Sequence, residues 1–268
     1  MSESGLANGI FYETLEGPSA DAPAVLLSAG LGGSGQFFKP QFDTLSRHFR
    51  VVLYDHRGTG KSARELTKPH SVEAMADDIL AVLDRLKLKQ AHIVGHAAGG
   101  VAALAIALKA PKRIDKLVLI NSWSKPDPHL ARCFELRMSL LKQSGRRAYV
   151  RAQQIFLYPA SWISKHNARL EAEETHHLRA LPKNEVVLER IRALMDFDIE
   201  VKLRQIKAPV LVSASADDML VPVSCSEHLA AKLANARLDI TPWGGHGFTV
   251  TAPEKFNKTL VAFLRGET

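Results

Sequence analysis

Short apolar segments alternate with amphipathic ones along most of the chain, and this alternation constrains the fold more than any other feature. Three segments have helical patterns, at residues 71–86, 99–109 and 253–264. The first repeats its apolar side chains every 3.6 residues behind Ser71, a favourable N-cap residue. Between the helices lie apolar runs short enough to be buried strands, at residues 23–29, 50–54, 91–94, 116–120, 209–213 and 237–240. Strands that alternate with helices form mostly parallel sheets covered on both faces, so the sequence predicts an α/β fold.

One long segment, residues 125–197, interrupts this alternation. It contains helical patterns and no convincing strand, and it is divided by Pro126, Pro128, Pro159 and Pro182. Sheets of this class bind ligands at the carboxyl ends of their strands. We therefore predict one structural domain, with an α/β core of residues 1–124 and 198–268 and a helical lid of residues 125–197.

The net charge of +7 is concentrated in the predicted lid. Residues 125–169 hold nine basic and two acidic residues, so this stretch alone carries +7 and the rest of the chain sums to zero. A solvated helix surface explains such a pattern most simply. An electrostatic field that attracts a small anion is the next interpretation, and a nucleic-acid surface is the least favoured.

Cysteine content and hydropathy indicate the compartment. Cys133 and Cys225 are too few for a disulfide framework and are interpreted as small buried hydrophobic residues. No apolar run approaches the roughly 18 residues of a membrane span, and the N-terminal residues lack the features of a secretory signal. We expect a cytoplasmic protein that binds neither membrane nor nucleic acid; the oligomeric state is left open.

A glycine-rich segment, residues 30–35, fits the dinucleotide-binding pattern G-x-G-x-x-G, and Asp55 follows it at a suitable distance. In that motif a helix begins within the turn and continues for about three turns. Pro40 would then lie in the helix interior, where it lacks an N–H and clashes with the preceding turn. Pro40 better suits the first position of a later helix, residues 40–49. We interpret residues 30–35 as a loop and expect no cofactor and no metal.

The segment Gly95-His96-Ala97-Ala98-Gly99-Gly100 follows a predicted strand and precedes a helix of small residues. This is the setting of the nucleophile elbow G-x-S-x-G, in which glycines allow a sharp turn from strand to helix. Ala97 occupies the nucleophile position. A methyl group cannot attack a carbonyl, so no acyl-enzyme can form at this residue.

Two later loops supply candidate catalytic groups. Asp217 and Asp218 follow the fifth predicted strand; Asp218 is favoured because it lies four residues before Pro222, and Asp217 is the alternative. His246 lies between glycines after the sixth predicted strand, and the order elbow, acid, histidine favours a catalytic role for it. The segment DHRGTGKS (55–62) is interpreted as structural, with its acid and arginine tying a loop together.

Taken together these motifs resemble the α/β-hydrolase superfamily, and the resemblance covers nearly the whole chain. It is carried by SAGLGGSG (28–35), DHRGTGKS (55–62), GHAAGG (95–100), DDMLVP (217–222) and GGHG (244–247). The alanine in the elbow is similar to that of the hydrolases of the Rut pyrimidine-degradation pathway, as are RCFELR (132–137), FLYPASW (156–162), RLEAE (169–173) and GGHGF (244–248). In those hydrolases an elbow without serine is expected, so Ala97 need not be an engineered change.

The resemblance implies a hydrolase that acts on carbamate or aminoacrylate during uracil nitrogen catabolism. It implies oxyanion donors at the backbone N–H groups of Leu31 and Ala98, and proton transfer by His246 with Asp218 orienting it. Arg132 and Arg137 are candidates for binding the substrate carboxylate, with salt bridging on a helix surface as the alternative. Two other functions stay open: a non-catalytic binding protein of hydrolase fold, and a serine esterase carrying a Ser→Ala change at position 97.

Overall fold

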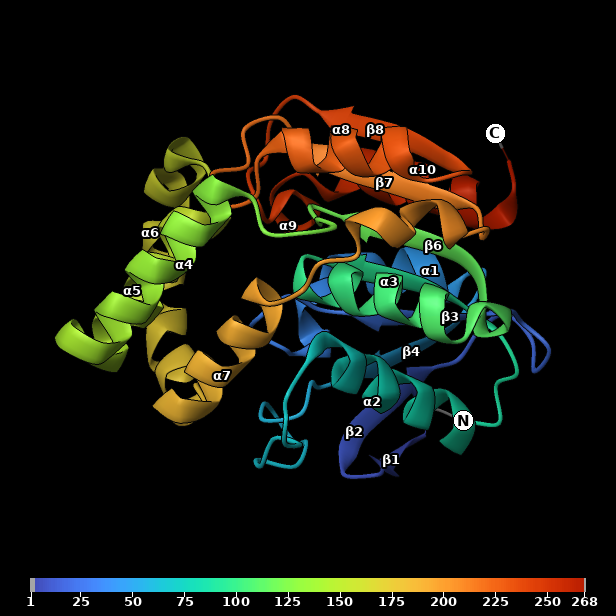
Figure 1. The fold of residues 1–268 in the computed structure, drawn as a ribbon, viewed down its shortest axis with the longest axis horizontal. Coiled ribbons are helices and arrows are strands. Elements are labelled where there is room, and N and C mark those ends of the chain that lie inside the picture. The colour runs from blue at the N-terminus through green and yellow to red at the C-terminus, as the bar shows by residue number, and fades with distance from the viewer. Residues whose placement is uncertain (1–2, 268) are drawn as a thin grey trace.

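An eight-stranded sheet forms the centre of the computed structural model, which describes residues 3–267 (Figure 1). In sheet order the strands are β1 (Ser4–Ala7), β2 (Ile10–Leu15), β4 (Arg50–Tyr54), β3 (Ala24–Ser28), β5 (Ala91–His96), β6 (Ile114–Ile120), β7 (Val210–Ser215) and β8 (Ala236–Thr241). The pairs β1–β2 and β2–β4 are antiparallel, and every other pair is parallel. The six strands predicted from the sequence are therefore confirmed within a few residues at their ends.

Helices cover both faces of the sheet, because its central strands are apolar on both sides. In β3, for example, Leu26 packs into one hydrophobic cluster while Val25 and Leu27 pack into the other. The first cluster lies under α2 (Val72–Arg85), α3 (Ala98–Lys109) and α8 (Val223–Lys232). The second lies under α1 (Phe42–Ser46) and α10 (Pro253–Arg265) on the opposite face (Figure 1). This arrangement confirms the predicted α/β-hydrolase architecture.

The helix predicted at residues 40–49 is present only in part, and the prediction that Pro40 begins it is wrong. Residues Gly35–Gln41 form a 3₁₀ helix that contains Pro40, and α1 begins only at Phe42. Contacts with the C-terminal part of the chain fix this geometry: the buried Gln41 donates from Nε2 to the carbonyl oxygen of Thr249, and Asn257 donates to that of Pro40. The interpretation of residues 30–35 as a loop fits the structure, in which the 3₁₀ helix begins only at the last glycine.

Four α-helices lie between β6 and β7: α4 (Pro128–Ser139), α5 (Gly145–Leu157), α6 (Ala160–Ala180) and α7 (Asn184–Met195). A π-helical turn, Leu140–Ser144, joins the first two. We call residues 128–195 the helical insertion; it projects to one side of the sheet and its helices (Figure 1). Prolines mark the starts of two of its helices, since Pro128 is the first residue of α4 and Pro159 is the N-cap residue of α6.

Most arginines of the basic stretch are bound within the insertion. Arg146 donates to the carbonyl oxygens of Leu181 and Pro182 at the end of α6. Arg147 and Arg151 both pair with Glu174, at 2.8 and 3.6 Å. Much of the positive charge therefore fastens the insertion helices to one another.

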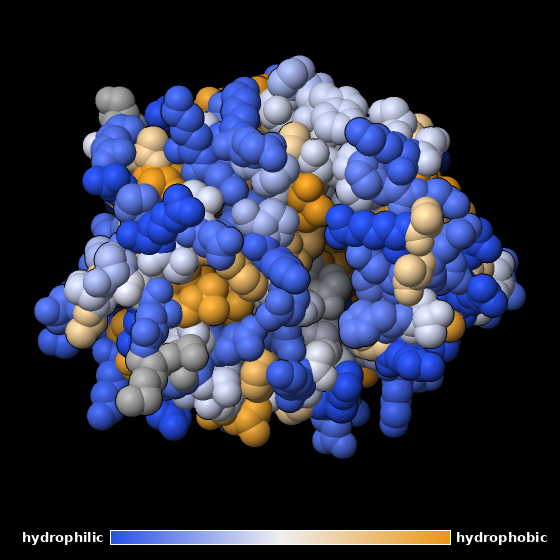
Figure 2. All heavy atoms as spheres, turned by 180° about the vertical axis from the view of Figure 1, so that it is seen from behind, coloured by the Kyte–Doolittle hydropathy of each residue, from blue (hydrophilic) through white to orange (hydrophobic). Residues whose placement is uncertain are grey.

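The surface is mainly hydrophilic on the face shown in Figure 2, broken by separate hydrophobic areas. Within residues 3–267 no helix is long and apolar enough to cross a membrane. Both cysteines are free; Cys133 is buried and Cys225 is half-buried, and burial raises the pKa of each thiol.

Replacing Gly99 by alanine is expected to destabilise the fold. A Cβ at this position would overlap the backbone carbonyl of Ser28 in β3, and backbone cannot move aside as a flexible side chain does. Overpacking of this kind costs about 1–3 kcal/mol or more. Gly32→Ala is the matched control, because a Cβ at that position would have no atom within 4 Å. Chemical denaturation of both variants measures the difference, and equal stabilities would contradict the packing described for the elbow.

Candidate active site

The turn between β5 and α3 retains the geometry of a nucleophile elbow. Ala97 has φ 48° and ψ −112°, a conformation that costs a non-glycine residue of the order of 1–3 kcal/mol. Its N–H donates to the carbonyl of Ile120 at 2.8 Å, and its own carbonyl accepts from Val101 at 3.0 Å. A Cβ on Gly95 would collide with the backbone of Gly100, which explains why glycines flank the turn. The strained turn is present although its side chain is only a methyl group.

Asp218, and not Asp217, is hydrogen-bonded to the histidine. Its Oδ2 lies 2.7 Å from Nδ1 of His246, and the two side chains are 0% and 3% exposed. Its Oδ1 accepts the backbone N–H groups of Leu220 and Val221 at 2.7 and 2.9 Å. These three bonds orient the carboxylate, and they fix the Nδ1 side of the imidazole ring.

Asp217 has a different position in the same loop. Its Oδ1 accepts from the Oγ of Ser215 at 2.6 Å and from the backbone N–H of Gly245 at 2.8 Å. It therefore ties the loop after β7 to the loop that carries His246.

Two residues that the sequence reasoning missed hold the backbone of His246. Nε2 of His96 and Nδ2 of Asn121 both lie 2.9 Å from its carbonyl oxygen. A carbonyl only accepts, so His96 carries its proton on Nε2. Burial lowers the pKa of His96 well below its usual value, which keeps the ring neutral. Asn121 also accepts from the N–H of Ser215 at 3.1 Å, linking the ends of β6, β7 and the histidine loop.

The loops that carry the two expected oxyanion donors adjoin at the elbow. A Cβ built on Gly30 would lie 3.7 Å from the Cβ of Ala97, so the loop that carries Leu31 adjoins the elbow. Ala98 is the first residue of α3, where the backbone N–H has no partner within the helix. The rings of His96 and His246 lie 4.6 Å apart, which brings the histidine to the elbow as well. The structure thus gathers the loops after β3, β5, β7 and β8 at one edge of the sheet.

A pocket of about 490 Å³ lies beside His246. One wall comes from the end of α5 and the start of α6, and the other from the loops after β7 and β8. The wall of the insertion is mainly apolar and includes Ile155, Phe156, Tyr158, Pro159 and Ile163. Helices of the insertion therefore line a pocket that reaches His246, while Leu31, Ala97 and Ala98 are not among its lining residues.

The two candidate arginines occupy different environments, and neither lines this pocket. Arg132 is exposed, and its side chain makes no hydrogen bond or ion pair among residues 3–267. Arg137 is 5% exposed; its guanidinium donates to the hydroxyl of Tyr149 at 3.2 Å and lies 5.5–5.7 Å from the ring centroids of Phe134, Tyr149 and Phe156. Its Nε is buried without a hydrogen-bond partner. Arg137 thus lies directly behind Phe156, one side chain away from the pocket.

Within the described residues, no group of three or more His, Cys, Asp or Glu side chains is placed to hold a metal ion. The acid–histidine pair is the hydrogen-bonded pair of titratable side chains that lies beside the elbow. It can hold a proton and transfer it at the free nitrogen of the ring.

Comparison with known proteins defines the class. A model of the alpha/beta hydrolase fold family matches residues 23–253, and the chain belongs to this family. A crystal structure of a hydrolase from Pseudomonas aeruginosa superposes with a TM-score of 0.87 at 28% identity, covering 98% of each chain. The enol-lactonase from Burkholderia xenovorans also gives 0.87, at 26% identity, over 98% of this chain and 100% of its own.

Within the family the similarity is much greater to one group of curated proteins, named "Putative carbamate hydrolase RutD". The protein of this name from Caulobacter sp. strain K31 is 60% identical over 99% of both chains. That from Agrobacterium fabrum is 48% identical over 91% of this chain and 94% of its own. The chain thus belongs to the RutD group and is a hydrolase by class.

Proposed function

We propose that this hydrolase cleaves the C–N bond of carbamate, releasing ammonia and CO2, in the nitrogen catabolism of pyrimidines. The name of its full-length relatives supports the substrate. The observation that carries the mechanism is the Asp218–His246 pair beside an elbow whose nucleophile position is a methyl group. Such a site has the proton-transfer half of the hydrolase machinery without the nucleophile.

Carbamate needs only a proton to break down. A protonated His246 donates from Nε2 to the carbamate nitrogen, the electron pair of the C–N bond leaves with that nitrogen, and ammonia and CO2 separate. His246 then regains its proton from solvent. Asp218 accepts a hydrogen bond from Nδ1 throughout, so it stabilises the protonated ring and keeps Nε2 available.

The backbone N–H groups of Leu31 and Ala98 are the proposed donors to the carboxylate of the substrate. Donors held by a helix N-terminus and a tight loop need no rearrangement at the moment of reaction. Arg132 and Arg137 would add longer-range attraction for the anion, Arg137 from its position behind Phe156.

We propose that residues 125–197, which include the helical insertion, act as a lid. Residues 1–124 and 198–268 would form the α/β core of the same structural domain. The contribution of the insertion to the wall of the 490 Å³ pocket supports this division. Two free cysteines fit a reducing compartment, and we propose a cytoplasmic location on that ground.

Aminoacrylate is the second candidate substrate, and the same acid–histidine pair could act on it. The pocket of about 490 Å³ has room for either molecule. Aminoacrylate tautomerises to an imine, water adds to the C=N carbon, and proton transfer to nitrogen releases ammonia and malonic semialdehyde. The same histidine would move the protons, and again no acyl-enzyme forms.

The Ala97→Ser variant separates this proposal from the two remaining alternatives. A hydroxyl at position 97, next to His246 and the oxyanion donors, is expected to create hydrolysis of an activated ester with a burst of acyl-enzyme. The wild type is expected to show no burst on the ester, yet to release ammonia from carbamate or aminoacrylate. Absence of both activities, ammonia release by the wild type and ester hydrolysis by the variant, would favour a non-catalytic binding protein. Ester hydrolysis by the variant alone, without ammonia release by the wild type, would favour an inactivated serine esterase.

A further inference from the structure

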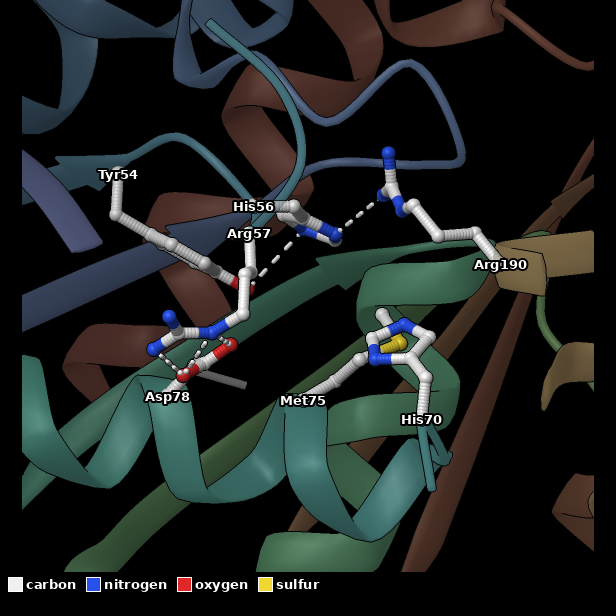
Figure 3. Close-up of a pocket in the computed structure, with 7 residues that line it drawn as sticks. All are labelled: Tyr54, His56, Arg57, His70, Met75, Asp78 and Arg190. Atoms are coloured by element: carbon white, nitrogen blue, oxygen red, sulfur yellow. Dashed lines mark hydrogen bonds and ion pairs between the residues drawn. The ribbon is translucent and has the colours of Figure 1, made fainter. Parts of the chain in front are cut away.

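A buried arginine without an acidic partner lies at the junction of the insertion and the sheet. Arg190 comes from α7 and is 3% exposed. Within residues 3–267 it makes no ion pair, and its one hydrogen bond runs from Nη2 to Nδ1 of His56 at 3.0 Å (Figure 3). Burial lowers the pKa of Arg190 to about 10, so the guanidinium is still charged at neutral pH. A buried charge of this kind costs several kcal/mol unless something compensates it.

The residues next to Arg190 do not supply a negative charge. His56 accepts from Arg190 at Nδ1, so its proton is on Nε2, which lies 3.1 Å from the hydroxyl of Tyr54. That hydroxyl in turn lies 2.7 Å from Oγ of Ser28. Burial and Arg190 hold the pKa of His56 well below its usual value, and burial raises the pKa of Tyr54 to a level at which it stays protonated. All the members of this chain are neutral apart from the arginine.

The nearby carboxylates are already paired. Asp78 on α2 accepts from Nη2 of Arg57 at 2.7 Å and from its Nε at 3.1 Å (Figure 3). Glu189, the neighbour of Arg190 on α7, pairs with Arg192 at 3.1 Å and is 43% exposed. The buried group of Arg57, Asp78 and Arg190 therefore carries a net charge of +1.

A small cavity lies within this group. It has a volume of about 10 Å³, close to what a single water-sized particle needs, and is lined by Tyr54, His56, Arg57, His70, Met75, Asp78 and Arg190 (Figure 3). His70 is 7% exposed, and neither of its ring nitrogens has a hydrogen-bond partner. Burial and the charge of Arg190 lower its pKa to about 4, so the ring is neutral and offers one unused N–H. The cationic guanidinium of Arg190 and the N–H of His70 thus both border a cavity for one water-sized molecule or ion.

We propose that this cavity binds a single halide ion, chloride at ordinary salt concentrations, between Arg190 and His70. A water molecule would accept hydrogen bonds from the two donors but would leave the charge of Arg190 uncompensated. A monoanion would accept the same hydrogen bonds and also compensate that charge. A halide ion is larger than water, so the flexible side chain of Met75 would have to move aside to admit it. The proposal does not depend on the reaction proposed above.

The ion would fasten the insertion to the sheet. Arg190 belongs to α7, while His56 follows β4 and His70 precedes α2. Helix α7 and the loop after β4 also touch nearby, since a Cβ on Gly58 would collide with the side chain of Val186 on α7. Halide binding is therefore expected to stabilise the native protein.

Thermal unfolding in different salts tests the proposal in solution. The Tm is expected to be about 5 °C higher in potassium chloride or bromide than in potassium gluconate at the same ionic strength, when the halide is in large excess over its Kd. Arg190→Met should remove this difference. The matched control, Arg192→Met, changes an exposed arginine two residues further along α7 and should retain it. Equal Tm values of the wild type in halide and gluconate would overturn the proposal.

A crystal of the wild type grown in bromide provides a second test that does not require a stable variant. An anomalous peak within hydrogen-bonding distance of Arg190 and His70, together with the shift in Tm, is the expected result. A cavity that holds water or nothing at high bromide concentration would overturn the proposal. A peak without any effect of halide on Tm would mean an adventitious ion only, and would overturn it as well.

Discussion

His246→Gln is expected to lower the rate of carbamate breakdown by about 10²–10⁴-fold, the contribution of a positioned proton donor, to the rate in buffer. Glutamine retains a hydrogen-bond donor of similar reach but cannot carry a proton between solvent and substrate. The side chain is nearly enclosed and bonded to Asp218, so no other residue replaces it without rearrangement. Ammonia release from carbamate, followed at fixed pH, measures the effect.

The matched control is His228→Gln on α8. His228 is 41% exposed and bonded to Glu200, and it is not part of the acid–histidine pair. The His228→Gln variant should retain the full rate of carbamate breakdown. A His246→Gln variant as fast as the wild type would remove His246 from the mechanism.

Asp78→Asn is expected to lower the free energy of unfolding by about 3–5 kcal/mol, as is typical when one partner of a buried ion pair is removed. Arg57 and Asp78 are only 10% and 8% exposed, and asparagine would leave the guanidinium buried beside a neutral group. Arg190 nearby carries the same charge and would add to the cost. Urea denaturation of the wild type and the variant measures the loss.

Asp77→Asn is the matched control for this variant. Asp77 is the preceding residue of α2, is 56% exposed and pairs with Lys109 at the surface. Exposed pairs contribute about 0–1 kcal/mol, so little change is expected. A loss of similar size in both variants would contradict the special role of the buried pair.

The parallel part of the sheet was predictable because its strands are short apolar runs between helices. The antiparallel strands β1 and β2 were missed, although their signal is present. Asn8 and Gly9 form the turn between them with φ of 49° and 78°, and an Asn-Gly pair is a strong indicator of a two-residue hairpin. The alternation of buried Ile10, Tyr12 and Thr14 with partly exposed residues is that of a strand with one face covered.

Much of the candidate site was also predictable, because the elbow, the acid loop and the histidine loop follow strands whose carboxyl ends meet at one edge. The spacing to Pro222 favoured Asp218 over Asp217, and the hydrogen bond to His246 agrees with that preference. The support that Asn121 gives to His246 was not predictable, since a contact between residues 125 positions apart depends on the whole sheet.

The structure also refines the interpretation of the basic segment. Arg146, Arg147 and Arg169 are bonded to groups within the insertion, as expected for a structural role. Arg132 is exposed and unpaired among the described residues, while Arg137 is buried among aromatic rings behind the pocket. Arg132 thus departs from the structural pattern, whereas Arg137 also bonds within the insertion through Tyr149. Both remain the proposed source of attraction for a small anion.

The rate of ammonia release from carbamate, with and without the protein, tests the central claim most directly. The measurement is best made by stopped flow near neutral pH, with the spontaneous rate in the same buffer recorded beside it. The predicted result is an acceleration of about 10²–10⁴-fold that is proportional to protein concentration and saturates with carbamate. A rate equal to that in buffer alone, at every protein concentration, would contradict the claim that this acid–histidine pair catalyses C–N cleavage without a nucleophile.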